Sequence, residues 1–390
     1  MKGVISLARF PAKAGSSRTE QRLMTGSYLA AERGVAIRAV QAACSITTNV
    51  FQHLVSSESI TKQDKSPVTI GDFSAQAVVN EVLSRHFPDD GIVGEEDSAD
   101  LQGEKGADLR SKVSHLVNDS LLHHGEIDSA LSDQQLLQAI DLGSFPGGTS
   151  KRFWALDPID GTKGFLRGGQ YAVCLALLVE GRVELGVMGC PNLPLNSAQA
   201  KPADGEIRSK NIPGLGAMFI AVRGQGAYVR PIQGKDAQET PIHMRDLHAD
   251  FSKAAFCESV EAGHSSLGTN ARIAELLGIP KGNSVRMDSQ AKYASIARGD
   301  GDIYLRLPVG DGSYEEKIWD HAAGAILVEE AGGIVSDIAG RPLDFRQGRT
   351  LRNNRGVIAS ESSMHSKLTQ VVAQALQEEG RAKLLEPKTS

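Results

Sequence analysis

The sequence predicts a mixed α/β fold, with an N-terminal α+β part followed by a C-terminal α/β part. Its 390 residues exceed what one hydrophobic core usually holds, so we expect two domains. Apolar, strand-like runs fill the middle of the chain, and beyond them helical and strand-like patterns alternate. We therefore place the domains at residues 27–240 and 241–380, flanked by a flexible or targeting extension at 1–26 and a frayed tail at 381–390.

The first third of the chain is predicted to be mainly helical. Apolar residues recur at helical spacing from 28 to 54. Residues 66–72 are predicted to be extended, with Asp72 capping a helix that Pro88 ends. A short buried strand at 91–94 and a two-helix insertion at 98–150 complete this part.

The middle and the end of the chain are predicted to supply the sheets. A strand at 153–156 leads into two hairpins, because each pair of apolar runs is separated by a short turn that contains glycine. The later helices are expected to alternate with strands. The predicted elements lie at 171–179, 183–189, 218–222, 227–230, 270–277, 292–297, 302–307, 321–331, 356–360 and 363–379.

Charge and cysteine content narrow the class of protein. Forty-two basic and forty-seven acidic residues give a net charge of −5, and no lysine-rich or arginine-rich block stands out. We therefore expect neither a nucleic-acid partner nor a membrane partner, and we expect a monomer. None of the four cysteines forms a CxxC pair, which favours buried thiols in an intracellular protein over disulfides or a zinc site.

The first 26 residues contain several basic side chains and serines but only one acid, Glu20. This composition resembles a transit peptide, and a weakly basic disordered tail is the alternative. We expect a cytoplasmic protein, or a mitochondrial one if the extension is a transit peptide.

The strongest chemical signal is the run Asp-Pro-Ile-Asp-Gly-Thr at 157–162, directly after a predicted strand. Pro158 fixes its own φ and keeps Asp157 extended, and Gly161 permits a tight turn. Both carboxylates can then point into one cavity, with the Ile159 carbonyl between them. Magnesium prefers such oxygen ligands, so the run predicts a cation site. The alternative is an acidic turn in which an aspartate caps a helix.

Three other acidic segments carry weaker signals. Glu95 follows a predicted strand, Asp320 begins an apolar helix, and Asp72 precedes another helix. Taken alone, a glutamate pair such as Glu95-Glu96 is typical of a solvated surface, and each aspartate is typical of a helix N-cap. Their order and wide separation along the chain are what make them informative together.

These motifs resemble the three signatures of the inositol monophosphatase superfamily, with Glu95-Glu96 first, 157–162 second and 319–324 third. Within that superfamily, the chain is similar to the fungal 3′(2′),5′-bisphosphate nucleotidases over about residues 27 to 375. The resemblance implies a layered αβαβα sandwich of the inositol monophosphatase and fructose-1,6-bisphosphatase type. The runs that carry the closer similarity are 65–69, 160–167, 263–266, 288–293 and 304–308.

The resemblance also implies how the acidic residues act. Two Mg²⁺ ions would be held by Glu95, Asp157, the Ile159 carbonyl, Asp160 and Asp320, with Asp72 helping to hold a third. The cations would neutralise charge on the reacting phosphate and activate a water. Asp72 and Thr162 would hold and deprotonate this water, which attacks phosphorus in line with the leaving alkoxide. Lithium would inhibit by replacing one Mg²⁺.

The same resemblance assigns the substrate contacts to Thr162, His264, Ser289, Lys292, Arg306 and Asp320. Outside this family context, His264 could be a turn residue, Lys292 an exposed lysine and Arg306 an edge-strand charge. The predicted reaction removes the 3′-phosphate from 3′-phosphoadenosine 5′-phosphate, and from its 5′-phosphosulfate analogue, in support of sulfur assimilation. The alternatives are an inositol (poly)phosphate 1-phosphatase and a non-catalytic phosphonucleotide sensor.

Overall fold

The computed structural model describes residues 28–56, 66–149, 152–196, 214–234, 237–260 and 267–387. The helices are α2 Ala30–Ser56, α3 Ser66–His86, α4 Ala107–His123, α5 Asp133–Asp141, α6 Thr162–Leu166, α7 Leu267–Leu277, α8 Ala291–Ala297, α9 Ala322–Glu330 and α10 Ser362–Glu378. The strands are β1 Gly91–Gly94, β2 Arg152–Asp160, β3 Ala172–Val179, β4 Arg182–Pro194, β5 Leu215–Val222, β6 Gly226–Pro231, β7 Thr240–Ile242, β8 Phe256–Glu258, β9 Ser284–Arg286, β10 Ile303–Arg306, β11 Gly333–Ser336 and β12 Val357–Glu361.

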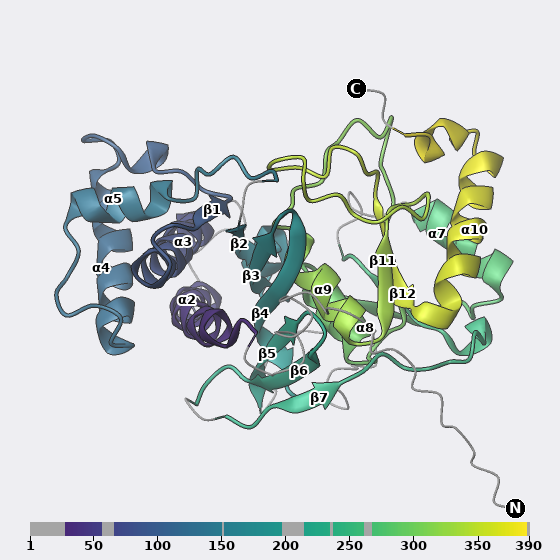
Figure 1. Ribbon diagram of the computed structural model, residues 1–390, viewed down its shortest axis with the longest axis horizontal. Helices are drawn as coiled ribbons and strands as arrows, with labels where there is room; N and C mark the ends of the chain where they lie inside the picture. The colour runs from purple at the N-terminus through teal and green to yellow at the C-terminus, as the bar shows by residue number, and fades with distance from the viewer. Residues whose placement is uncertain are drawn as a thin grey trace, which may run out of the picture.

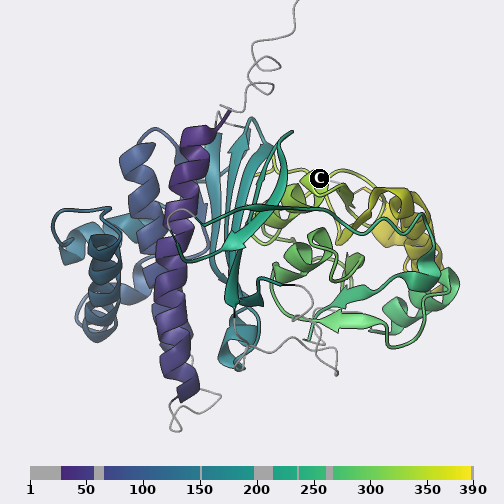
Figure 2. The same cartoon turned by 90° about the horizontal axis from the view of Figure 1, so that it is seen from below.

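Within the described residues, two sheets alternate with three helical layers (Figure 1). Helices α2 and α3 cover the outer face of the larger sheet, and Figure 2 shows α2 running along that face. Helices α8 and α9 lie between the two sheets, and α10 and α7 cover the smaller sheet from outside. This arrangement confirms the predicted αβαβα sandwich.

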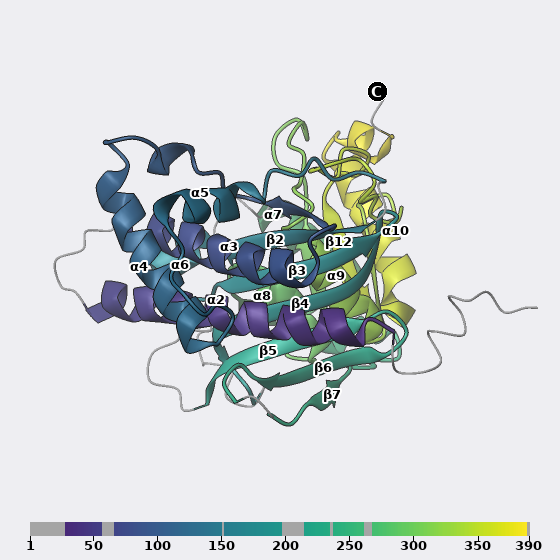
Figure 3. The ribbon, with the colours of Figure 1, turned by 60° about the vertical axis from the view of Figure 1, so that its left-hand side comes forward.

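The larger sheet is a meander of strands β1 to β7 in sequence order, as far as the described chain shows. Among its described strands, β1 and β2 pair in parallel and the other neighbours pair antiparallel. Its strands are apolar on both faces because a helical layer covers each face. In β3, for example, Leu175 joins the core under α2 and α3, whereas Cys174 joins the core under α8 and α9. Figure 3 shows α2 and α3 crossing this sheet.

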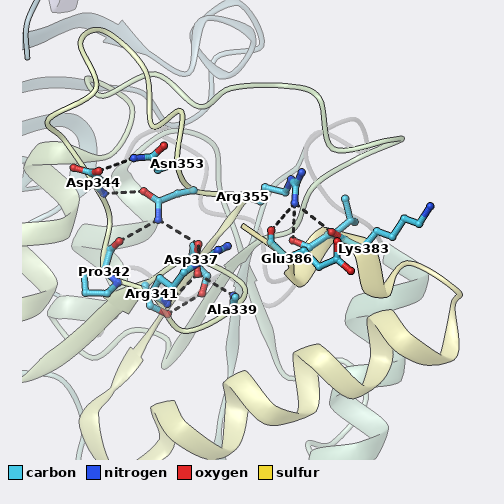
Figure 4. A network of polar contacts seen from close by, with 12 residues as sticks. Asp337, Ala339, Arg341, Pro342, Asp344, Asn353, Arg355, Lys383 and Glu386 are labelled. Carbon is cyan, nitrogen blue, oxygen red and sulfur yellow. Dashed lines mark hydrogen bonds and ion pairs between the residues drawn. The ribbon is translucent and has the colours of Figure 1, made fainter. Parts of the chain in front are cut away.

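The smaller sheet has the strand order β11-β12-β10-β8-β9 among the described residues. Helix α10 packs against β12, and the chain then continues into a short 3₁₀ helix, Ala382–Leu385, with Leu384 buried. Arg355 donates hydrogen bonds to the carbonyls of Lys383 and Glu386 in this segment (Figure 4). The segment is therefore held against the fold, although the sequence predicted a frayed tail there.

Two further sequence expectations can be compared with the structure. Residues 66–72 are helical rather than extended, so Asp72 lies inside α3 and is not its N-cap. Pro67 is tolerated there because the N–H groups of the first helical turn have no intrahelical partner. The boundary predicted after residue 240 falls inside β7, which pairs with β6 in the larger sheet.

The four cysteines are free and buried, as predicted. Of the helices in the described part of the chain, none has the length and apolarity that a bilayer span requires.

Candidate active site

A β-bulge at the end of β2 brings the two carboxylates of the central motif to one face of the sheet. Residues three apart on a regular strand face opposite sides. Here Asp157 pairs with Cys174 and Asp160 pairs with Ala172, so β2 contains one extra residue between them. Because of the extra residue, Asp157 and Asp160 face the same side of the sheet, the side covered by α8 and α9. Pro158 is tolerated because a bulge does not need every N–H.

Gly161 turns the chain from β2 into α6 and cannot be replaced without strain. Its φ of 91° lies in the left-handed region, which residues with a Cβ rarely adopt. A Cβ built on Gly161 would also lie 2.8 Å from the Cβ of Ser289. The turn therefore lets the loop before α8 approach, and the main-chain N–H of Gln290 donates to Asp160 Oδ2 at 2.5 Å.

Helix α3 brings Asp72 beside this turn. The helix packs closely because Gly71 has no side chain, and a Cβ there would lie 2.7 Å from Ile159 Cδ1. One turn later, Gln76 donates through Nε2 to the Glu96 carbonyl at 2.6 Å and accepts from the Glu96 N–H at 3.0 Å. Gln76 thus fixes the backbone next to Glu95 at the end of β1.

Gln290 and His321 hold the segment 319–324, which contains Asp320. Gln290 donates to the Trp319 carbonyl at 2.7 Å and accepts from the Gly324 N–H at 3.0 Å. His321 is fully buried, with Nδ1 2.8 Å from Tyr293 Oη and Nε2 3.2 Å from Glu316 Oε2. Asp320 is therefore presented by a segment that is fixed on both sides.

These elements enclose a cavity of about 260 Å³. It brings together most of the predicted site residues, while Asp72 lies buried beside it. His264 lies outside the described residues. The predicted residues that line the cavity are Glu95, Asp157, Ile159, Asp160, Thr162, Ser289, Lys292, Arg306 and Asp320, and the unpredicted ones include Lys163, Asp288, Gln290, Tyr304, Tyr314 and His321.

Burial, together with the charges of neighbouring carboxylates, raises the pKa of the acids in and beside this cavity. Burial, followed by the charges of Glu95, Asp160 and Asp320, raises the pKa of Asp157 well above its usual value. Burial and the charges of Asp160 and Glu95 raise the pKa of Asp320 well above its usual value. Burial and the nearby charges of Glu96 and Glu95 raise the pKa of Asp72 in the same way. The pKa of Glu95 rises to about 7 through loss of hydration and the charges of Glu96 and Asp160.

Lys292 and Arg306 are cationic side chains that line the same cavity. Lys292 is 4% exposed, its Nζ donates to the Ser289 carbonyl at 2.9 Å, and burial lowers its pKa against the charges of Asp160 and Asp288. Arg306, at the end of β10, donates through Nε to both oxygens of Glu316 at 2.8 Å. The charges of Lys292 and Arg306 oppose the burial that raises the pKa of Asp160, so the two charge types share one space.

The donor set fits hard cations. Asp157 Oδ1 is buried and has no hydrogen-bond partner among the described residues, an arrangement that is costly unless a cation or water completes it. In the described chain, the side chains of Glu316, Asp320 and His321 form another group that could hold a metal ion, with ligand atoms within 4.8 Å of one another. Glu316 and His321 are already bonded to Arg306 and Tyr293, so we assign them to support of the site.

Sequence reasoning missed the glutamines that hold the signatures in place. Gln76 and Gln290 are buried and bond to main-chain groups of distant segments. The available signal was a stripe of polar residues at helical spacing in an otherwise apolar segment, formed in α3 by Asp72, Gln76 and Asn80. That signal does not reveal the bonding partner.

The layered sandwich has an acid-lined cavity to which both sheets contribute, and comparison with known proteins gives the class as a phosphatase. The model of the inositol monophosphatase family matches residues 29–380. A protein of Emericella nidulans named 3'(2'),5'-bisphosphate nucleotidase is 48% identical over 351 residues, which cover 88% of this chain and 98% of the relative. A Schizosaccharomyces pombe protein of the same name is 47% identical, with coverage of 88% and 95%. The chain belongs to the inositol monophosphatase family, as the motifs predicted.

A solved structure gives independent support for the fold. An inositol monophosphatase from Anabaena (Nostoc) sp. PCC 7120 superposes with a TM-score of 0.53 at 21% identity, covering 89% of this chain and 97% of its own.

Proposed function

We propose that this chain is a Mg²⁺-dependent 3′(2′),5′-bisphosphate nucleotidase that converts 3′-phosphoadenosine 5′-phosphate to AMP. The observation that carries the proposal is that one cavity contains both a carboxylate cluster and the cationic side chains of Lys292 and Arg306. A substrate with two phosphates needs both, because only one phosphate can react while the other is held apart. The names of the relatives at 47–48% identity support the same substrate class.

The carboxylate cluster would hold the reacting phosphate through cations. Glu95, Asp157, the Ile159 carbonyl, Asp160 and Asp320 are the ligands, with Asp72 beside them for a third ion. Bound Mg²⁺ would neutralise phosphate charge and lower the pKa of a coordinated water. Asp72 accepts the proton of the attacking water, and the Thr162 hydroxyl, exposed in the cavity at the start of α6, orients it.

Lys292 and Arg306 would hold the second phosphate. Glu316 accepts from Nε of Arg306, and the two terminal nitrogens of the guanidinium can donate to a phosphate. Lys292 adds a second positive charge, and Ser289 and His264 are the remaining proposed nucleotide contacts. By this arrangement the 5′-phosphosulfate analogue is also a substrate, which would connect the enzyme to sulfur assimilation.

Phosphate release in Mg²⁺ from three substrates tests the proposal. We expect 3′-phosphoadenosine 5′-phosphate to be far better than 3′-AMP, because buried donors left without a phosphate discriminate strongly. Asp157→Asn protein purified in parallel controls for contaminating phosphatases. Equal kcat/KM for the two nucleotides would refute the proposal, and a clear preference for inositol 1,4-bisphosphate would favour an inositol phosphate phosphatase. Turnover of any of them would exclude the non-catalytic sensor.

A further inference from the structure

Arg349 binds the end of β1, the strand that directly precedes Glu95. Its guanidinium donates to three main-chain oxygens, through Nη2 to the Gly94 carbonyl and through Nη1 to those of Gly143 and Phe145 at 3.0 and 3.2 Å. Gly94 directly precedes Glu95, and its own N–H donates to the Gly143 carbonyl at 2.8 Å. One side chain therefore joins the end of β1 to the segment that flanks it.

The same residue also holds the segment that carries Asp320. The Arg349 guanidinium lies 4.8 Å from the centre of the Trp319 ring, and the Arg349 carbonyl accepts from the Ile318 N–H at 3.1 Å. A β-bridge between Lys317 and Thr350 extends this contact. Trp319 directly precedes Asp320, so Arg349 contacts the neighbours of two acids that lie far apart in the sequence.

An arginine is chemically suited to both contacts at once. The edge of a planar guanidinium donates to several carbonyls while its face stacks on an indole. The three carbonyls lie in partly buried positions, and the Gly143 carbonyl also accepts from the Gly94 N–H. Loss of the arginine donor at the Gly94 and Phe145 carbonyls costs free energy. A lysine keeps the charge but offers neither the fork nor the flat face.

The Asp320 side chain has no hydrogen bond of its own to the described residues, so its position depends on its backbone. We propose that Arg349 is a positioning residue for the cation site, which sets the separation of Glu95 and Asp320 by tying their two backbones together. This inference rests on the cation ligands of the proposed function. It predicts that Arg349 governs cation affinity while lying outside the cavity itself.

Mn²⁺ binding to the metal-free protein tests this directly, with free Mn²⁺ counted by electron paramagnetic resonance and no substrate present. Arg349→Met keeps the length of the side chain and should raise the Mn²⁺ dissociation constant by about 10–100-fold, the usual effect of losing a residue that orients a metal ligand. Arg349→Lys should also lose most of the Mn²⁺ affinity, because a single charged amine does not replace the several N–H donors of the guanidinium. The KM for substrate at saturating Mg²⁺ should stay unchanged.

Arg352→Met is the matched control, since Arg352 is an exposed arginine three positions further along the same loop. Its Mn²⁺ affinity should equal that of the unmodified protein. If Arg349→Met does not fold, as judged by urea unfolding in EDTA, Arg349→Lys carries the test. Unchanged affinity in a folded Arg349 variant, or an equal loss in Arg352→Met, would overturn the inference alone. Failure of the unmodified protein to bind Mn²⁺ would overturn the cation assignment and this inference with it.

Discussion

Removing the Arg306 guanidinium should erase much of the preference for a bisphosphate over a monophosphate. The side chain is 19% exposed, and Glu316 holds it through Nε. Its two terminal nitrogens can each donate to the second phosphate. Hydrogen bonds to charged groups contribute about 1.5–3 kcal/mol each, so two of them are worth about 3–6 kcal/mol. With about 1.4 kcal/mol for each factor of ten, discrimination should fall by about 10²–10⁴-fold.

The measurement is the ratio of kcat/KM for 3′-phosphoadenosine 5′-phosphate to that for 3′-AMP, in Arg306→Gln and in the unmodified enzyme. The ratio is informative because both substrates meet the same altered site. Any general damage, including the loss of the Glu316 partner, affects both reactions and largely cancels. Arg306→Lys should give an intermediate ratio, since it keeps the charge and loses the paired donors.

Arg352→Gln serves as the control, because it removes one positive charge from an exposed position outside the cavity. It should leave the ratio unaltered. A ratio in Arg306→Gln equal to that of the unmodified enzyme would show that the second phosphate is bound elsewhere, even if the bisphosphate remained the preferred substrate.

Three more outcomes are expected. Asp157→Asn and Asp320→Asn should each abolish turnover and yet stabilise the cation-free fold above pH 7, because each removes a charge that its neighbours repel; near-normal activity at low Mg²⁺ would contradict the ligand assignment. Asp72→Asn should lower kcat by about 10²–10⁴-fold with little change in KM, as for loss of a general base, and Thr162→Val should act in the same direction; an effect on KM alone would make both residues binding groups. In the folded chain the pKa of Glu95 is about 7 and that of Asp157 is well above its usual value. The folded chain therefore keeps protons on these two acids at pH values where the unfolded chain has released them. The free energy of unfolding in EDTA should therefore fall as pH rises from about 4 through 7, and urea titrations that show it rising would contradict this.

Local chemistry was sufficient to predict the strongest part of the site. Pro158 and Gly161 act on the backbone within a few residues, so their effect on Asp157 and Asp160 is visible in the sequence. The same holds for β3, whose unbroken apolar run indicates burial on both faces. Asp72 shows the limit of such reasoning, because the sequence indicated a cap and the structure places the residue inside α3, where Gly71 lets the helix approach Ile159.

The sequence by itself determined the acidic motifs and the mixed α/β class, because hydrophobic period and turn chemistry depend on near neighbours. The layered fold and the family followed from the resemblance that those motifs carry. Tertiary structure decided how the motifs meet. Gln290 bonds to Asp160 across 130 positions of sequence and Arg349 to Gly94 across 255. Polar side chains of this kind have many possible partners in an unfolded chain. Only the packing of α8 and of the loop before β12 against the larger sheet selects one, because burial makes an unpaired donor costly.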